Sequence, residues 1–243
     1  MQHEFTVERT PSLILNNRKH PANIRYSFVK EYIKGKDVLE IGCGNVDIFK
    51  HLDSAKSVFV IDYNPQIIRK LKNKNKSSKF DFAVYCLPEL PKKKFDCIIC
   101  FEVIEHITKS DAKKLLRNFK KVLRRNGRLI ISTPNKKMYS PYTDFPLDCY
   151  HLYEYTYEEI KKMLEKEVKI VDTKYISLSK SKINFSLALL WLLRDIKQRE
   201  LFLLSPFLVI SQFLATLISV TKVKIIDVRD ETAINFIFVC KLK

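Results

Sequence analysis

Short apolar runs alternate along this chain with longer segments in which apolar residues recur every three or four positions. The short runs are rich in β-branched and aromatic residues and predict strands, whereas the longer period predicts amphipathic helices. Such an alternation predicts an α/β fold with a doubly wound, mostly parallel sheet covered by helices on both faces. We expect strands at residues 37–41, 57–61, 80–85, 95–100 and 128–132 and helices at 64–72 and 110–125.

Further segments on both sides extend this sheet. A helix over 21–34 is expected to cover the entrance to the sheet, and after the fifth strand a helix is expected at 157–166. Strands at 168–175 and 234–241 would complete the sheet, the last of them antiparallel. We therefore predict a single domain with a helical cap at 1–35, a core at 36–178, an apolar helical insert at 179–230 and the last strand at 231–243.

The insert is unusually apolar, because residues 202–220 contain no charged side chain. This run approaches the length that crosses a bilayer. Pro206 and Gln212 interrupt it, and a span would separate the last strand from the sheet that it is expected to join. The alternatives for 183–220 are helices packed on the domain, a homodimer contact or a peripheral membrane contact, and a true span is the least favoured.

Charge and cysteine content bear on the binding partners and the cellular compartment of the protein. The 44 Lys and Arg residues against 27 Asp and Glu give a formal net charge of +17, which attracts RNA, phosphorylated substrates or an acidic membrane surface without choosing among them. Cys97 and Cys100 have CxxC spacing but fall on opposite faces of one predicted strand, so we assign them to core packing. All six cysteines fall in apparent core segments and no secretory signal is visible, which predicts a cytoplasmic protein, with membrane association left open.

A glycine turn with acidic neighbours follows the first predicted strand. Glu40 precedes Gly42 and Gly44, and Asp47 stands where a dinucleotide-binding fingerprint would have its third glycine. Two carboxylates would repel a diphosphate, which disfavours a dehydrogenase, but they suit a ligand with an ammonium and a sulfonium group, such as S-adenosylmethionine. Asp62 ends the second strand, 22 residues after Glu40, where a carboxylate can accept hydrogen bonds from both ribose hydroxyls.

Five motifs in order resemble the class I, Rossmann-like S-adenosylmethionine-dependent methyltransferases, in particular the group typified by ubiquinone-biosynthesis O-methyltransferases. The resemblance covers residues 36–166 and implies methyl transfer with S-adenosyl-L-methionine as cofactor. The motifs are VLEIGCG (38–44), VFVIDYN (58–64), LPELPKKKFDCIICFEVIEHI (87–107), GRLIISTPN (127–135) and HLYEYTYEEI (151–160).

The resemblance also implies a role for individual residues. The methionine part would lie along the glycine turn, the ribose at Asp62, the adenine against Tyr63 and near Leu87, and both cofactor and acceptor beside Glu102. Two departures bear on cofactor affinity, because Val46 replaces the third glycine of the family and Cys86 stands where an Asp or Asn is usual. The implied cofactor-binding set is Glu40, Gly42, Cys43, Gly44, Asp62, Tyr63, Leu87 and Glu102.

Two histidines fall at the same end of the predicted sheet. His106 follows the fourth strand, and His151 lies in a later Tyr-rich loop. Because transfer to a hydroxyl requires a base, and histidine has a suitable pKa, His106 is the candidate catalytic base. A divalent metal is a second, less favoured interpretation, since Glu102, Glu105, His106 and His151 could surround one ion.

These observations predict an S-adenosylmethionine-dependent methyltransferase that O-methylates a small-molecule, glycan or lipid-linked acceptor. An RNA ribose 2'-O-methyltransferase is the first alternative, because the ExxEH and HLYEYT elements resemble those of small-RNA terminal ribose methyltransferases and the chain is basic. RNA is the less favoured partner, since no RNA-binding module is recognisable. The second alternative is a non-catalytic binding or scaffold protein that keeps the fold.

Overall fold

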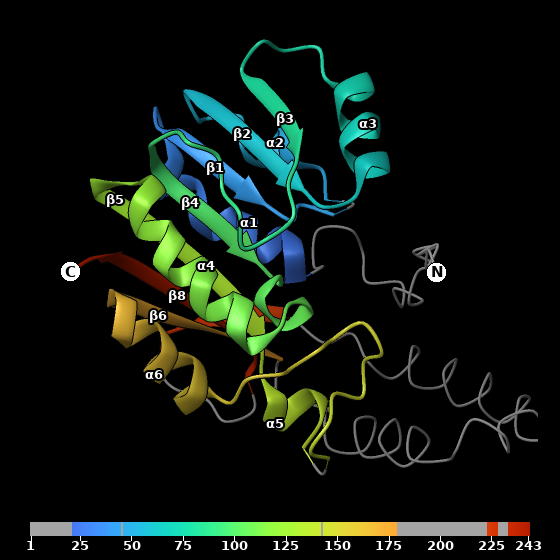
Figure 1. Ribbon diagram of the computed structural model, residues 1–243, viewed down its shortest axis with the longest axis vertical. Helices are drawn as coiled ribbons and strands as arrows, with labels where there is room; N and C mark the ends of the chain where they lie inside the picture. The colour runs from blue at the N-terminus through green and yellow to red at the C-terminus, as the bar shows by residue number, and fades with distance from the viewer. Residues whose placement is uncertain (1–20, 45, 142, 179–222, 228–232) are drawn as a thin grey trace, which may run out of the picture. The chain divides into compact units, whose positions relative to one another are not determined.

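In the computed structural model, an eight-stranded sheet forms the centre of the chain, with the strand order β3-β2-β1-β4-β5-β8-β6-β7 (Figure 1). The residues that the structure describes are 21–44, 46–141, 143–178, 223–227 and 233–243. The strands are β1 (Asp37–Ile41), β2 (Ser57–Asp62), β3 (Phe80–Val84), β4 (Phe95–Phe101), β5 (Leu123–Pro134), β6 (Val168–Leu178), β7 (Val223–Ile226) and β8 (Ala233–Leu242).

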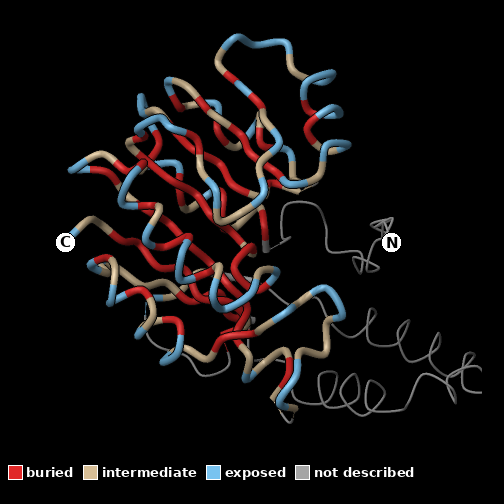
Figure 2. Tube along the Cα trace, viewed as in Figure 1, coloured by how far each residue is buried: buried red, intermediate tan, exposed pale blue. Residues whose placement is uncertain are grey.

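Strands β1 to β5 pair in parallel, and β8 runs antiparallel between β5 and β6. The predicted mostly parallel sheet with an antiparallel last strand is therefore confirmed. Buried residues follow the central strands and the sheet-facing sides of the helices, as Figure 2 shows. This continuous apolar core holds the carboxyl ends of β1, β2 and β4 at one edge of the sheet, which is the usual place for ligands in open α/β folds.

Helices cover both faces of the sheet. Helices α4 and α6 contact each other on the face turned toward the viewer in Figure 1, and α1 and α2 contact each other behind it. The helices are α1 (Pro21–Ile33), α2 (Ile48–His51), α3 (Pro65–Lys74), α4 (Lys109–Val122), α5 (Lys136–Tyr139) and α6 (Tyr157–Glu167), with a 3-10 turn, η2 (Ile104–His106), after β4.

The bounds of α4 differ from the prediction at both ends. Thr108 accepts a hydrogen bond from the amide of Asp111, so the helix begins one residue earlier than expected. It ends at Val122 rather than near 125, because Leu123 already pairs with β4. A Cβ at Gly127 would lie 2.8 Å from the Asp96 carbonyl oxygen, so this glycine allows β5 to approach β4 closely where their register shifts.

Two other predictions need correction. Residues 223–226 form strand β7, although we placed them in a helical insert, and their β-branched residues favour a strand. Cys86 and Cys149 are exposed, because they lie in connections rather than in the core, whereas the other four cysteines are buried. The remainder of the insert, including 183–220, and the cap residues before Pro21 lie outside the described residues. Within the described part of the chain, no helix is long and apolar enough to cross a membrane.

Candidate functional site

The glycine turn after β1 is tightly constrained. Gly42 and Gly44 have φ angles of +68° and +54°, a region that glycine adopts readily and other residues adopt at a cost. The Gly42 amide donates to the Ile61 carbonyl of β2 at 2.9 Å. A Cβ at Gly42 would lie 2.6 Å from Cγ2 of Val103, whereas nothing lies within 4 Å of the same position at Gly44. The turn thus requires glycine at position 42 for two reasons, the positive φ angle and the lack of space for a Cβ.

Gly42→Ala is therefore expected to lower the free energy of unfolding by about 2–4 kcal/mol, from the left-handed backbone and the overlap with Val103 together. Gly35→Ala is the matched control, because Gly35 has φ +67° but open space around it, and it should lose only about 1–2 kcal/mol. Urea unfolding measures both. Gly42→Ala should cost less in a Val103→Ala background than in the wild type, and equal losses at positions 35 and 42 would contradict the steric argument.

Glu40 is a fully buried carboxyl group beneath this turn. Its Oε1 accepts a hydrogen bond of 2.5 Å from the hydroxyl of Tyr26 on α1, and its Oε2 has no hydrogen-bond partner among the described residues. Burial raises the pKa of Glu40 to about 8, against the opposing effect of the Tyr26 hydrogen bond. A buried carboxyl group with an unused oxygen is costly unless a partner reaches it, and a cationic partner would favour its ionised form.

Asp62 and Tyr63 end β2 beside the glycine turn. The Asp62 side chain is nearly buried and accepts a hydrogen bond of 2.9 Å from the Asn64 amide. Burial raises the pKa of Asp62, while hydrogen bonds from backbone amides, including that of Gly44, act in the opposite direction. Tyr63 is 62% exposed, so an aromatic face lies open next to the carboxylate. This pair offers hydrogen-bond acceptors and a stacking surface at adjacent positions.

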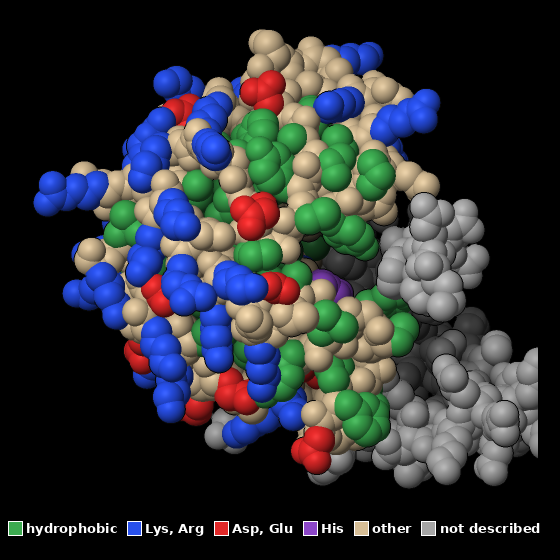
Figure 3. All heavy atoms as spheres, in the orientation of Figure 1, with side chains coloured by type: hydrophobic (Ala, Val, Ile, Leu, Met, Phe, Trp, Pro, Cys, Tyr) green, Lys and Arg blue, Asp and Glu red, His purple; other side chains and the backbone are tan. Residues whose placement is uncertain are grey.

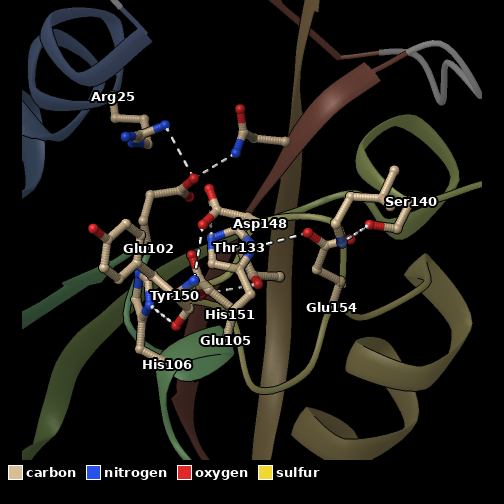
Figure 4. A network of polar contacts seen from close by, with 12 residues as sticks. Arg25, Glu102, Glu105, His106, Thr133, Ser140, Asp148, Tyr150, His151 and Glu154 are labelled. Atoms are coloured by element: carbon tan, nitrogen blue, oxygen red, sulfur yellow. Dashed lines mark hydrogen bonds and ion pairs between the residues drawn. The ribbon is translucent and has the colours of Figure 1, made fainter. Parts of the chain in front are cut away.

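Glu102 is held by three elements at the end of β4 (Figure 4). Its φ of +54° is unusual for a residue other than glycine. Its Oε1 accepts from the Ser132 hydroxyl at 2.6 Å, its Oε2 accepts from the Asn235 amide at 2.6 Å, and Arg25 of α1 lies 3.6 Å from Oε2. Residues from β5, β8 and α1 therefore fix this carboxylate. A left-handed backbone at a residue other than glycine is costly and is typical of functional sites.

Glu105, His106 and His151 meet beside Glu102, with the two imidazole rings 4.9 Å apart between centroids (Figure 4). The Glu105 carbonyl oxygen accepts from the amides of Leu152 at 2.7 Å and Tyr153 at 3.1 Å, which binds the later loop to the segment after β4. The Glu105 carboxyl group is buried, so its pKa is raised, and its Oε1 has no partner among the described residues. The predicted proximity of the two histidines is thus observed.

Both histidines form a hydrogen bond through Nδ1, and for His106 this bond identifies the nitrogen that remains available. His106 Nδ1 lies 2.8 Å from the Tyr150 carbonyl oxygen, which can only accept, so Nδ1 carries the hydrogen and Nε2 keeps its lone pair. His151 Nδ1 lies 2.7 Å from the buried carboxyl group of Glu154. His106 is an exposed residue, but packing around its ring lowers its pKa, against the effect of the Tyr150 hydrogen bond. His106 is therefore neutral near pH 7 and can accept a proton.

The predicted metal set comes together only in part. Glu105, His106 and His151 each place one ligand atom within 4.8 Å of the others, and carboxylate with imidazole is a donor set that many divalent ions accept. Glu102 does not belong to this group, and its two oxygens accept hydrogen bonds from Ser132 and Asn235 instead. The geometry thus permits an ion at three of the four residues, and the metal stays the less favoured prediction.

Several residues of this site do not follow from the sequence alone. Tyr26 and Arg25 come from α1, and Asn235 comes from the last strand, so no local pattern connects them to Glu40 or Glu102. Glu154 was within reach of sequence reasoning, because it follows His151 by three positions. Leu87 is packed against the core and Cys43 is buried, so contacts of either with a ligand stay predictions.

A family model described as a methyltransferase domain matches residues 17–167, which is more than half of the chain. The chain belongs to this methyltransferase family. The match includes the glycine turn, Asp62 and the segment from Glu102 to His151, so most of the site described above lies within it, and Asn235 of β8 lies outside it.

Known relatives agree with this assignment for the methyltransferase domain. A probable S-adenosylmethionine-dependent methyltransferase of Mycobacterium tuberculosis is 30% identical over 66% of this chain and 59% of its own length. A ubiquinone biosynthesis O-methyltransferase of Coxiella burnetii is 26% identical over 48% of this chain and 51% of its own length. The matches thus span between half and three fifths of these relatives.

Solved structures confirm the fold of the domain. The N-methyltransferase NodS of Bradyrhizobium japonicum, in complex with S-adenosyl-L-homocysteine, superposes with a TM-score of 0.54 at 19% identity, covering 66% of this chain and 82% of that one. This likeness shows the class I methyltransferase fold that the motifs predicted. At this identity it carries no information on the acceptor.

The site of the methyltransferase domain fits S-adenosylmethionine in its chemistry. The unused buried oxygen of Glu40 could receive an ammonium, the open space at Gly44 admits a ligand close to the backbone, and Asp62 offers acceptors to a ribose. Val46, which replaces the third glycine, donates its amide to the Cys43 carbonyl at 3.3 Å, so the turn forms without that glycine.

Proposed function

We propose that this methyltransferase domain transfers the methyl group of S-adenosylmethionine to a hydroxyl oxygen of a small-molecule, glycan or lipid-linked acceptor. The observation that carries this proposal is the neutral His106, whose Nε2 is left as a proton acceptor beside the carboxyl end of β4. A hydroxyl must lose its proton as the new bond forms, and a positioned imidazole near its own pKa is suited to take it.

Each side chain of the site then has a separate task. S-adenosylmethionine, when bound, supplies a methyl group already activated on a sulfonium, so that alignment is the main remaining requirement. Glu40 and Asp62 would hold the methionine and ribose parts, and Glu102 is fixed where cofactor and acceptor would meet. His106 would remove the acceptor proton at Nε2, and Glu154 would orient His151 through Nδ1.

A transfer assay with a labelled methyl group tests this proposal. Purified protein would be incubated with the labelled donor and with separate pools of soluble glycans, lipid-linked glycans, small phenols, amines and RNA. Product nuclear magnetic resonance then distinguishes a methyl ether from an N-methyl group. We expect methyl ethers from a hydroxyl-bearing pool, and inhibition by S-adenosylhomocysteine. Label only in amines would contradict O-methylation, and label in RNA ribose would assign the RNA alternative.

The same assay decides the role of a metal. Because we assign proton removal to His106 alone, methyl transfer is expected to persist after treatment with a chelator. Activity that disappears with the chelator and returns with Mg²⁺ or Mn²⁺ would instead assign Glu105, His106 and His151 to metal binding. Absence of S-adenosylmethionine binding under all these conditions would favour the scaffold alternative.

A further inference from the structure

A basic groove of about 420 Å³ lies between α4 and α6. Figure 3 shows Lys and Arg side chains gathered over these two helices. Two acidic residues, Glu159 and Glu167, also line it, above a floor that includes Tyr153 and Leu116. The cations that line this basic groove are Lys109, Lys113 and Arg117 of α4 and Lys162 and Lys166 of α6.

The acidic residues of the basic groove are already engaged. Glu167 pairs with Lys120 at 2.6 Å, which is not one of the five lining cations. Glu159 accepts hydrogen bonds from the Tyr153 hydroxyl and from the Thr156 amide at the start of α6. Among the described residues, none of the five lining cations has a carboxylate oxygen within 4.0 Å. Five lining cations against two carboxylates leave the basic groove with a net positive charge, although Lys109 is near enough to Glu159 to lower the pKa of that carboxyl group.

The spacing of these cations sets them in rows. Lys109, Lys113 and Arg117 follow one another at intervals of four residues, so they share one face of α4 with a rise of about 6 Å between neighbours. Lys162 and Lys166 repeat this interval on α6. Like charges four residues apart repel each other and weaken a helix, unless an anion lies between them. Two facing rows therefore suit a ligand with more than one negative charge.

One end of the basic groove adjoins the histidine pair. Lys109 follows His106 by three residues, and its Nζ lies 3.4 Å from the centroid of the Tyr153 ring. The Tyr153 amide in turn donates to the Glu105 carbonyl oxygen at 3.1 Å. The residues Lys109 and Tyr153 of the basic groove are thus joined through the backbone to the segment that carries Glu105 and His106.

We propose that the basic groove binds a phosphate ester or diphosphate group carried by the methyl acceptor. Lysine and arginine are the usual partners of phosphate oxygens, and arginine can bind two of them at once. The acceptor class is then a phosphorylated or diphosphate-linked compound whose hydroxyl lies beyond its phosphate, at the His106 end. This inference rests on the proposed function, because it names the acceptor of the same site.

Calorimetric binding of inorganic diphosphate to the full chain tests the basic groove directly. The test variant is the double substitution Lys113→Glu with Arg117→Glu, and the control is Lys121→Glu with Arg125→Glu, which removes the same charge from exposed positions outside the groove lining. We expect the test variant to weaken diphosphate binding by about tenfold or more, since it replaces two attractive contacts by repulsive ones. The control should stay within about twofold, and neither should change the affinity for S-adenosylmethionine.

The remaining results of this binding experiment either support or overturn the proposal. Equal weakening in both variants, or no binding of diphosphate, would overturn the proposal in favour of a diffuse surface field. An RNA oligonucleotide bound more tightly than diphosphate, and released by the test variant, would overturn it in favour of nucleic acid. Phosphatidylcholine vesicles carrying a lipid diphosphate, captured by the wild type but not by the test variant, would support a lipid-linked source. A soluble sugar diphosphate bound in the same manner would support a soluble one.

The experiment separates this inference from the proposed function. Groove-dependent diphosphate binding without any methyl transfer to hydroxyls would leave the binding site standing and reject O-methylation. Methyl transfer to hydroxyls without any groove-dependent binding of diphosphate would do the reverse.

Discussion

Replacement of Asp62 by alanine is expected to weaken S-adenosylmethionine binding by about 100-fold or more. The buried carboxylate stands at the end of β2, where it can accept hydrogen bonds from both ribose hydroxyls. Hydrogen bonds to a charged group are worth about 1.5–3 kcal/mol each, and about 1.4 kcal/mol corresponds to a factor of ten in affinity. Two such bonds therefore account for at least two orders of magnitude.

Calorimetry with S-adenosylmethionine and S-adenosylhomocysteine measures this loss. Asp81→Ala is the matched control, since it removes an equal charge from an exposed position on the neighbouring strand β3. Asp62→Asn helps to separate binding from folding, because an amide oxygen can still accept from the Asn64 amide. We expect Asp62→Asn to unfold near the wild-type temperature and still bind weakly. An affinity for Asp62→Ala within about threefold of the wild type would rule out the ribose assignment.

The part of this site that follows from local sequence is the part formed by strand ends. Glu40, Gly42 and Asp62 each stand at or just after a strand whose apolar run is plain in the sequence, and parallel strands bring their carboxyl ends to one edge. The fold class and most element bounds follow from the same periodicity. His106 and His151 could be grouped because His106 follows β4 directly and His151 lies in the connection after β5, whose strand ends at the same edge.

The remainder depends on contacts between distant segments. Tyr26 bonds to Glu40 across 14 residues, and Asn235 bonds to Glu102 across 133 residues. A periodic pattern shows that such residues lie in a helix or a strand, but it does not show which polar partner they meet. The basic groove illustrates the same limit, because the lysines of α4 and α6 read separately as solvated helix faces. Only the packing of α4 against α6 brings their rows together.

Replacement of His106 by alanine is expected to lower kcat for O-methylation by about 10²–10⁴-fold, the usual contribution of a general base, while the affinity for S-adenosylmethionine stays unchanged. His106→Gln is the informative companion, because its amide can keep a hydrogen bond to the Tyr150 carbonyl but cannot take up a proton. Both variants should therefore lose kcat to a similar extent. A His106→Gln enzyme with nearly full activity would show that the residue acts through shape alone.

The pH dependence of the wild type gives an independent check on this base. Packing around the ring lowers the pKa of His106 below its usual value of about 6.5. A lowered pKa means that the imidazole stays neutral at pH 7 and becomes protonated only at more acidic pH. Activity should thus be level through pH 7 and fall as the pH drops below about 6.5. A fall that begins above pH 7 would assign the proton transfer to another group.

Glu154→Gln alters the partner of the neighbouring His151. We expect this variant to lower kcat while the acid limb of the pH profile moves only slightly, because Glu154 acts on the base only through His151.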